Sequence, residues 1–340
     1  MKKLTERRPP SVRVVALGGG TGLSTMLRGL KAHLPELGRR PPKPAISELT
    51  AVVTVTDDGG SSGRLRRDYK VLPPGDIRNC LVALSKDEAL LGKLFQYRFP
   101  RGRGLGGHSF GNLFLTALTN SMGDFPKAVQ VSAEVLAIQG RIFPSTAENV
   151  TLEALLEDGT IVAGETNISR SRKKITQLRL VPRRVRPLPE VLNALQDADL
   201  ILVGPGSLYT SLLPNLLVEE VAEVIAHSKA TRVYIANLMT QPGETERYSV
   251  VDHVRAIYEH TRRPLFDLAI VNRSAVSPQV LRRYRAQGAE PVDPSPEGLA
   301  RMGIRYVTGD FLQQDGVVRH DAVRLSQVIL TEFAQGRMKR

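Results

Sequence analysis

Short apolar runs recur along the chain, separated by segments in which apolar residues return every three or four positions. The runs, rich in Val, Leu and Ile, are typical of strands buried in a parallel sheet and cover residues 12–17, 49–55, 200–203, 233–236 and 268–271. The spacing of Leu23, Leu27 and Leu30 predicts an amphipathic helix. Further helices are expected over residues 76–84, up to residue 118, and over 214–227, 249–260, 281–286 and 323–333. This alternation predicts an α/β fold with a mainly parallel sheet flanked by helices.

Residues 148–186 interrupt this rhythm. Strand-like runs cover residues 150–155, 160–162 and 175–180, and Asp158-Gly159 between the first two favours a hairpin turn. The segment is therefore expected to be a small antiparallel β insertion. The expected organisation is a basic tail (1–12), a nucleotide-binding α/β core (13–147), the insertion (148–186), the rest of the core with C-terminal helices (187–336) and a second basic tail (337–340).

Composition limits the class of protein. Hydrophobic residues make up 41% of the 340, enough for a folded core. The one cysteine, Cys80, excludes an internal disulfide framework and favours a reducing compartment. No run approaches the ~18 apolar residues that a membrane-spanning helix needs, and no apolar run typical of a signal peptide follows the basic N-terminus. We expect a cytoplasmic protein without a membrane span.

The net charge of +13 raises the question of a nucleic-acid partner. Much of this charge lies in the two tails and in the segment from Arg170 to Arg186, which contains no acidic residue. No aromatic residues interleave with these basic runs, and the chain has no recognisable DNA- or RNA-binding motif. Solvated surface charge is the preferred interpretation, and RNA binding is the weakest of the functions considered.

A glycine-rich loop follows the first predicted strand. Its residues Gly19, Gly20, Thr21 and Gly22 precede a helix, so backbone N–H groups and the helix N-terminus can approach a phosphate closely. The spacing is neither that of the dinucleotide fingerprint nor that of a P-loop. A tight strand-to-helix turn is the structural alternative.

A second loop, from Asp57 to Gly63, follows the next strand. Asp57 and Asp58 can bind a ribose or substrate hydroxyl, or a hard cation such as Mg²⁺, with Ser61 and Ser62 beside them. A capped turn is the alternative, because Asp, Gly and Ser also dominate turns. Asp76, nearby in sequence, is expected to be the N-cap of the helix that ends at Leu84.

A third loop follows the strand at residues 200–203. Gly204, Gly206, Ser207 and Thr210 offer backbone donors and hydroxyl groups. Ligands of open α/β sheets bind at the carboxyl ends of the strands, so two such loops together favour a nucleotide diphosphate.

Other polar residues are weaker candidates. Arg78 and Asn79, and His108 and Asn112, lie at predicted helix starts, and a hydrogen-bonded structural role is the alternative for His108. Near the C-terminus, Arg319 could clamp a diphosphate and Tyr284 could present its ring to a nucleobase. The alternative is that Arg319 pairs with a surface acid, that Tyr284 packs and that Asp321 caps the last helix. No zinc-protease, C-x-x-C or serine-nucleophile motif is present.

Six ordered motifs carry a family resemblance. They are residues 15–24 (VALGGGTGLS), 56–65 (TDDGGSSGRL), 72–81 (LPPGDIRNCL), 107–113 (GHSFGNL), 204–217 (GPGSLYTSLLPNLL) and 237–245 (NLMTQPGET). With these motifs the chain resembles the bacterial gluconeogenesis factor family, a CofD-like family related to 2-phospho-L-lactate transferase. The resemblance implies a Rossmann-like, doubly wound fold, a cytoplasmic protein needed for normal cell shape during gluconeogenic growth, and a nucleotide ligand such as a UDP-sugar.

The resemblance leaves two functional hypotheses. In the first, the protein is a nucleotide-binding regulator whose bound state is sensed by a partner protein. It is expected to form a homodimer. In the second, it is a CofD-like transferase that uses a nucleoside diphosphate donor and Mg²⁺, with Asp57, Asp58 and Asp76 as candidate catalytic residues. The motif at residues 72–81 differs from the transferase branch, and no positioned nucleophile or base is evident. The regulator is therefore preferred, with no firm cofactor or metal.

Overall fold

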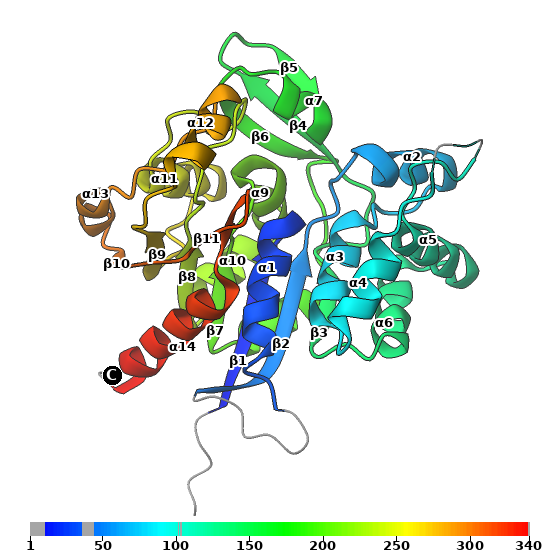
Figure 1. Cartoon of the computed structure of the whole chain (residues 1–340), viewed down its shortest axis with the longest axis horizontal. Helices are drawn as coiled ribbons and strands as arrows, with labels where there is room; N and C mark the ends of the chain where they lie inside the picture. Colours follow the sequence, from blue (N-terminus) through cyan, green and yellow to red (C-terminus); the bar gives the residue numbers. More distant parts are fainter. Residues whose placement is uncertain (1–10, 36–43, 101, 103, 339–340) are drawn as a thin grey trace, which may run out of the picture.

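Seven parallel strands form the central sheet (Figure 1). Their order is β10-β9-β8-β7-β1-β2-β3. The strands are β1 (Ser11–Gly18), β2 (Ala45–Val53), β3 (Arg141–Pro144), β7 (Leu200–Val203), β8 (Thr231–Ile235), β9 (Leu268–Asn272) and β10 (Arg305–Gly309). Every pairing in this sheet is parallel. The predicted α/β class and doubly wound, Rossmann-like sheet are therefore confirmed.

The computed structural model describes residues 11–35, 44–100, 102 and 104–338. Most of the predicted basic tail at residues 1–12 lies outside these ranges, as do Lys339 and Arg340. Helix α14 extends through Met338, so the second predicted tail begins inside a helix.

The order of the strands reverses at β1. This strand pairs with β2 on one side and with β7 on the other, and Leu17 is level with Val203 while Gly18 is level with Val53. The loops after β1 and β7 therefore leave the sheet side by side at a topological switch point, where open α/β sheets bind ligands.

Helices cover both faces of the sheet (Figure 1). They are α1 (Gly20–Lys31), α2 (Gly60–Tyr69), α3 (Gly75–Leu84), α4 (Glu88–Gln96), α5 (Phe110–Met122), α6 (Phe125–Val135), α8 (Pro189–Asp197), α9 (Leu213–Leu216), α10 (Val221–His227), α11 (Val250–Thr261), α12 (Pro278–Ala286), α13 (Pro296–Arg301) and α14 (Ala322–Met338). Among the described residues, none of these helices is both long and apolar enough to cross a membrane.

Several predicted elements were wrong in detail. Residues 214–227 do not form one helix, because a π-helical turn (Leu208–Leu212) precedes α9 and the left-handed Glu220 separates α9 from α10. Asp76 is not an N-cap, since α3 begins at Gly75 after Pro74 and Asp76 lies in its first turn. The second strand starts at Ala45 and ends at Val53. The expected Asp57 to Gly63 loop is shorter, because α2 begins at Gly60.

The predicted insertion forms a separate three-stranded antiparallel sheet, of order β5-β4-β6. Its elements are β4 (Thr151–Leu156), β5 (Ile161–Ala163), α7 (Glu165–Arg170) and β6 (Ile175–Val181). The Asp158-Gly159 turn joins β4 to β5, with Gly159 at φ +82°. Figure 1 shows this sheet at the top of the molecule, beyond the central sheet. A second small sheet is the hairpin of β11 (Leu312–Gln314) and β12 (Val318–His320).

Helix α14 packs closely against α1 at Gly29. A Cβ atom at this position would lie 2.0 Å from the Ala322 carbonyl oxygen, so only glycine permits the approach. Gly92 in α4 is different, because a Cβ there would meet only the Val82 side chain at 3.7 Å.

We expect Gly29→Ala to destabilise the protein by about 1–3 kcal/mol, because the helices must separate. Gly92→Ala, the matched control, should be stabilising by about 0.5–1 kcal/mol, because it removes glycine from a helix interior without a clash. Urea denaturation measures both. Equal effects of the two substitutions would show that the α1–α14 contact does not constrain the fold.

Candidate functional site

The loops after β1 and β7 touch one another at the switch point. A Cβ on Gly22 would lie 2.4 Å from the Pro205 carbonyl oxygen. Asn215 joins the same wall, because its Nδ2 donates to the Gly18 carbonyl at 2.9 Å. The Gly206 N–H donates to Asn237 Oδ1 at 3.2 Å. The two glycine loops are thus one connected unit.

The glycines of the first loop have different physical roles. Gly20 adopts φ +61°, a left-handed conformation that favours glycine, and no atom lies within 4 Å of a Cβ built on it. Open space therefore faces the N-terminus of α1. Gly19 is confined instead, since its Cβ would meet Asp76 Oδ2 at 2.6 Å and the Thr54 methyl group at 2.8 Å. Gly204 has φ +90°, and Thr210 is buried in the helical turn that follows.

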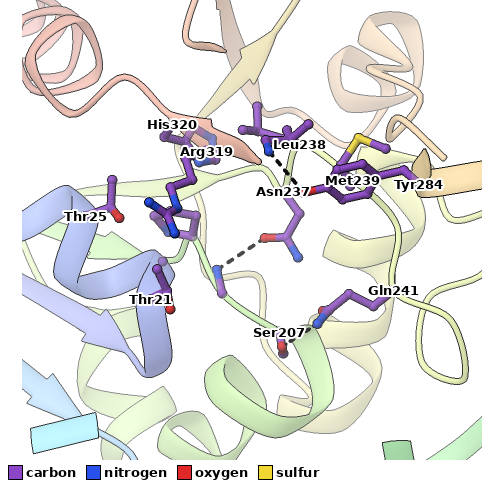
Figure 2. Close-up of a pocket in the computed structure, with 14 residues that line it drawn as sticks. Thr21, Thr25, Ser207, Asn237, Leu238, Met239, Gln241, Tyr284, Arg319 and His320 are labelled. Carbon is purple, nitrogen blue, oxygen red and sulfur yellow. Dashed lines mark hydrogen bonds between the residues drawn. The ribbon is translucent and has the colours of Figure 1, made fainter. Parts of the chain in front are cut away.

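A pocket of about 220 Å³, the switch-point pocket, lies beside these loops (Figure 2). Its walls include six residues predicted from the sequence: Thr21, Gly22, Gly206, Ser207, Tyr284 and Arg319. Eight further lining residues were not among the predicted site residues: Thr25, Pro205, Asn237, Leu238, Met239, Gln241, Val318 and His320. Four of these lie at 237–241, within a motif that carried the family resemblance, which is the signal that could have identified them.

The β11–β12 hairpin carries Arg319 into this pocket (Figure 2). Its backbone is tied to α12, because the Val318 N–H donates to the Tyr284 hydroxyl at 3.0 Å. No described residue forms a hydrogen bond or ion pair with the Arg319 side chain, so the predicted alternative of a surface acid pair is not observed. The neighbouring His320 is buried, and burial lowers its pKa to about 4.

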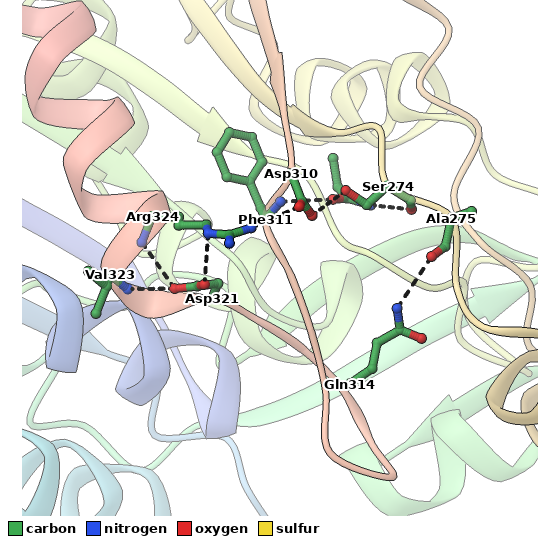
Figure 3. Close-up of polar contacts among 9 residues, drawn as sticks. Ser274, Ala275, Asp310, Phe311, Gln314, Asp321, Val323 and Arg324 are labelled. Carbon is green, nitrogen blue, oxygen red and sulfur yellow. Dashed lines mark hydrogen bonds and ion pairs between the residues drawn. The ribbon is translucent and has the colours of Figure 1, made fainter.

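Polar contacts fix the ends of this hairpin (Figure 3). Asp310 accepts from the Ser274 hydroxyl and, at 2.8 Å, from Arg324 Nη1. Gln314 Nε2 donates to the Ala275 carbonyl at 3.3 Å. Asp321 accepts from the backbone N–H of Arg324 at 3.0 Å, so it caps α14 as its structural interpretation predicts.

One oxygen in the switch-point pocket lacks a partner. Gln241 Nε2 donates to Ser207 Oγ at 2.6 Å, which fixes the amide, but Gln241 Oε1 is buried without a hydrogen bond to any described residue. A buried acceptor left unpaired costs about 1–3 kcal/mol. A ligand with a hydroxyl or N–H group would satisfy it.

The predicted carboxylates do not line this pocket. Asp58 Oδ1 accepts from the Thr166 backbone N–H at 2.9 Å and from its hydroxyl at 2.6 Å, so Asp58 ties the insertion to the core. Asp57 Oδ1 accepts from the Gly59 N–H at 2.8 Å.

Asp57 and Asp76 belong to an acidic cluster that also contains two residues missed in the sequence. Burial and the charge of Asp57 raise the pKa of Asp76 to about 6. Burial, and then the charges of Asp57, Asp76, Glu244 and Asp58, raise the pKa of Glu165 to about 9. Glu165 comes from the insertion, where no motif marks it, and Glu244 comes from the loop after β8, within the motif at residues 237–245.

The remaining polar candidates form an internal network. Arg78 Nη1 donates to Ser109 Oγ at 2.7 Å and to Asn112 Oδ1 at 2.9 Å, and Nη2 donates to Asn79 Oδ1 at 2.9 Å. His108 Nδ1 lies 2.9 Å from Ser61 Oγ, which also accepts from Asn112 at 3.1 Å.

This network joins α2, α3 and α5, and buried Ser62 lies beside it. It does not reach the switch-point pocket. His108 is therefore bonded in the manner of a structural histidine, and burial lowers its pKa.

Across the described ranges, no three His, Cys, Asp or Glu residues are grouped so that they could hold a metal ion. Asp58 and Asp57 each accept a hydrogen bond from a protein N–H group.

The raised pKa of Glu165 makes stability depend on pH. The unfolded chain ionises this group near pH 4.5, whereas the folded protein retains the proton until about pH 9. Folded stability therefore falls as pH rises between these values.

We expect Glu165→Gln to remove this pH-dependent loss of stability. The unfolding free energy of the variant minus that of the wild type should therefore be at least ~1 kcal/mol larger at pH 8 than at pH 5. Glu297→Gln, at an exposed position on α13, is the control. Urea denaturation at the two pH values measures the difference. A gain independent of pH would show that Glu165 ionises normally in the folded protein.

Comparison with known proteins places the chain in a family. The model of the family described as 2-phospho-L-lactate transferase CofD matches residues 14–312. A gluconeogenesis factor of Bacillus subtilis is 44% identical and covers 94% of this chain and 97% of its own length. One from Halalkalibacterium halodurans is 46% identical, with 93% and 95% covered. A crystal structure of a UPF0052 family protein from Bacillus halodurans has a TM-score of 0.88 at 44% identity, covering 94% of this chain and 99% of that chain. The chain therefore belongs to the CofD family, among relatives named gluconeogenesis factors.

Proposed function

We propose that the protein binds a nucleoside diphosphate sugar, of the UDP-sugar kind, in the switch-point pocket. The observation that carries this proposal is Arg319, whose guanidinium lines the pocket with the glycine loops and has no hydrogen-bond or ion-pair partner among the described residues. Guanidinium groups bind phosphate oxygens in a bidentate, charge-assisted manner. The N-terminus of α1 adds backbone donors and a favourable dipole for the same anion.

The other walls suit the rest of a nucleotide. The Tyr284 ring offers a face to a base, and its position is held by the hydrogen bond between its hydroxyl and Val318. The unpaired oxygen of Gln241 would accept from a hydroxyl or an N–H group of the ligand. The volume of about 220 Å³ is below the ~300–1,000 Å³ of pockets that enclose a whole drug-sized ligand, so part of the nucleotide extends outside. A single nucleotide sugar fits this description better than a dinucleotide.

We propose that binding serves regulation in the cytoplasm, including the control of cell shape during gluconeogenic growth. In this proposal the bound state is sensed by a partner protein, and the chain works as a homodimer. Two relatives named gluconeogenesis factor support the physiological part. The hairpin that carries Arg319 is exposed along much of its length, so a partner can reach the element that contacts the ligand.

Transfer of a phosphorus-containing group is the second candidate function. The family model named for a transferase favours it, as does the acidic cluster at Gly19. One observation weighs against it. The Ser61–His108 pair is buried in the internal network rather than open to the switch-point pocket.

Titration calorimetry of Arg319→Ala with UDP-glucose tests the binding proposal. We expect binding to weaken by about 1.5–3 kcal/mol, the scale of a hydrogen bond to a charged group. The melting temperature without ligand should barely change, because no described residue forms a hydrogen bond or ion pair with the Arg319 side chain. EDTA should not alter the wild-type affinity.

Arg282→Ala, which removes an exposed cation of α12 outside the pocket, is the matched control. Wild-type affinity in Arg319→Ala, or a large loss of apo stability, would reject Arg319 as a ligand contact. Affinity that depends on Mg²⁺ would favour the transferase.

A further inference from the structure

A second pocket, larger than the first, lies between the insertion and the loop after β8. This insertion pocket has a volume of about 480 Å³, and its walls include Arg172, Lys174, Glu244, Arg247 and Tyr248. It shares no lining residue with the switch-point pocket. It is therefore a separate compartment with its own chemistry.

Most acidic groups around the insertion pocket already have partners. Glu157 Oε1 accepts from the Lys174 backbone N–H at 3.4 Å, and Glu246 Oε1 accepts from the Gly243 N–H at 3.2 Å. Asp252 belongs to the capping box of α11. Lys173, also in the wall, is paired with Asp158 at 2.6 Å.

Three cationic side chains of the wall remain unpaired. Within the part of the chain that the structure describes, no hydrogen bond or ion pair involves the side chain of Arg172, Lys174 or Arg247. Two of these residues are also conformationally unusual, since Arg172 has φ +52° and Arg247 has φ +61°. Non-glycine residues in the left-handed region are uncommon and often occur at ligand clamps.

Glu244 provides a second, independent indication of a ligand. It is only 6% exposed and lines the pocket. Its Oε1 accepts from Ser169 Oγ at 2.7 Å, whereas its Oε2 is buried without a hydrogen-bond partner among the described residues. A donor group of a ligand would satisfy this oxygen.

We propose that the insertion pocket binds a small hydroxylated anion of the sugar phosphate class. Its anionic group would lie among Arg172, Lys174 and Arg247, and a hydroxyl group would donate to Glu244 Oε2. The volume falls within the ~300–1,000 Å³ range of small-molecule sites. This site shares no lining residue, and therefore no charged side chain, with the proposed nucleotide site.

A single turn connects the two pockets. Gln241 lines the switch-point pocket and Glu244 lines the insertion pocket. The turn between them is held by hydrogen bonds from the N–H groups of Glu244 and Thr245 to the Gln241 carbonyl, at 3.1 and 2.9 Å. The two pockets therefore lie on either side of one short turn of the chain.

Titration calorimetry with glucose 6-phosphate on the full chain tests this proposal, with glucose and inorganic phosphate as partial probes. We expect glucose 6-phosphate to bind better than either partial probe. Arg172→Ala and Arg247→Ala should each weaken glucose 6-phosphate binding tenfold or more. Glu244→Gln should reduce the ratio of the affinity for glucose 6-phosphate to the affinity for inorganic phosphate. Arg282→Ala, which removes the same charge elsewhere, should leave binding unchanged.

Arg319→Ala separates this proposal from the nucleotide proposal. We expect it to leave glucose 6-phosphate binding within twofold of wild type, even if it abolishes nucleotide binding. Loss of glucose 6-phosphate binding in Arg319→Ala would place the probe in the switch-point pocket and overturn the proposal. Absence of binding in the wild type, or equal losses in Arg172→Ala and Arg282→Ala, would also overturn it. Binding of a single-stranded RNA probe that requires Arg172 and Arg247, without sugar phosphate binding, would replace it with a nucleic-acid surface.

Discussion

The contact between Gly22 and the Pro205 carbonyl is the constraint on which the site depends. It brings the loops after β1 and β7 together, because a side chain at residue 22 would force them apart. Strand order alone places the two loops side by side at the carboxyl edge of the sheet. The contact makes them one wall, and the β11–β12 hairpin supplies Arg319 opposite that wall. The open space at Gly20 and the position of the Arg319 guanidinium across the pocket follow from this arrangement.

The insertion is joined to the loops after β2 and β8 through carboxylates as well as through apolar packing. Asp58 binds Thr166 of the insertion, and Glu244 of the core accepts from Ser169. These contacts enclose Glu165 near Asp57 and Asp76, which keeps its pKa high. Glu244 also lines the insertion pocket. Acids that resemble metal ligands in the sequence thus hold two parts of the protein together.

The sequence predicted the features whose signals are local. Residues 200–203 are entirely apolar because β7 is buried on both faces, so its position was predicted correctly. Both edge strands of the central sheet were missed, β3 because it is only four residues long and β10 because its residues are exposed or half-buried. Helix α2 was missed because its polar, glycine-containing sequence has no apolar periodicity. Glu165 and Glu244 come close to one another only in the folded protein, so no local pattern predicted their interaction. The grouping of Arg319 and Tyr284 with the glycine loops likewise depends on the three-dimensional fold.

The central claim is that the switch-point pocket recognises a nucleoside diphosphate. Native mass spectrometry of the purified, undenatured protein tests it most directly, because a ligand that co-purifies is identified by its mass without any assumption about the base or the sugar. We expect an added mass that corresponds to a nucleoside diphosphate or its sugar derivative, and displacement of this ligand by excess UDP-glucose. Protein that carries no nucleotide and also gains no mass from added UDP-glucose would contradict the account.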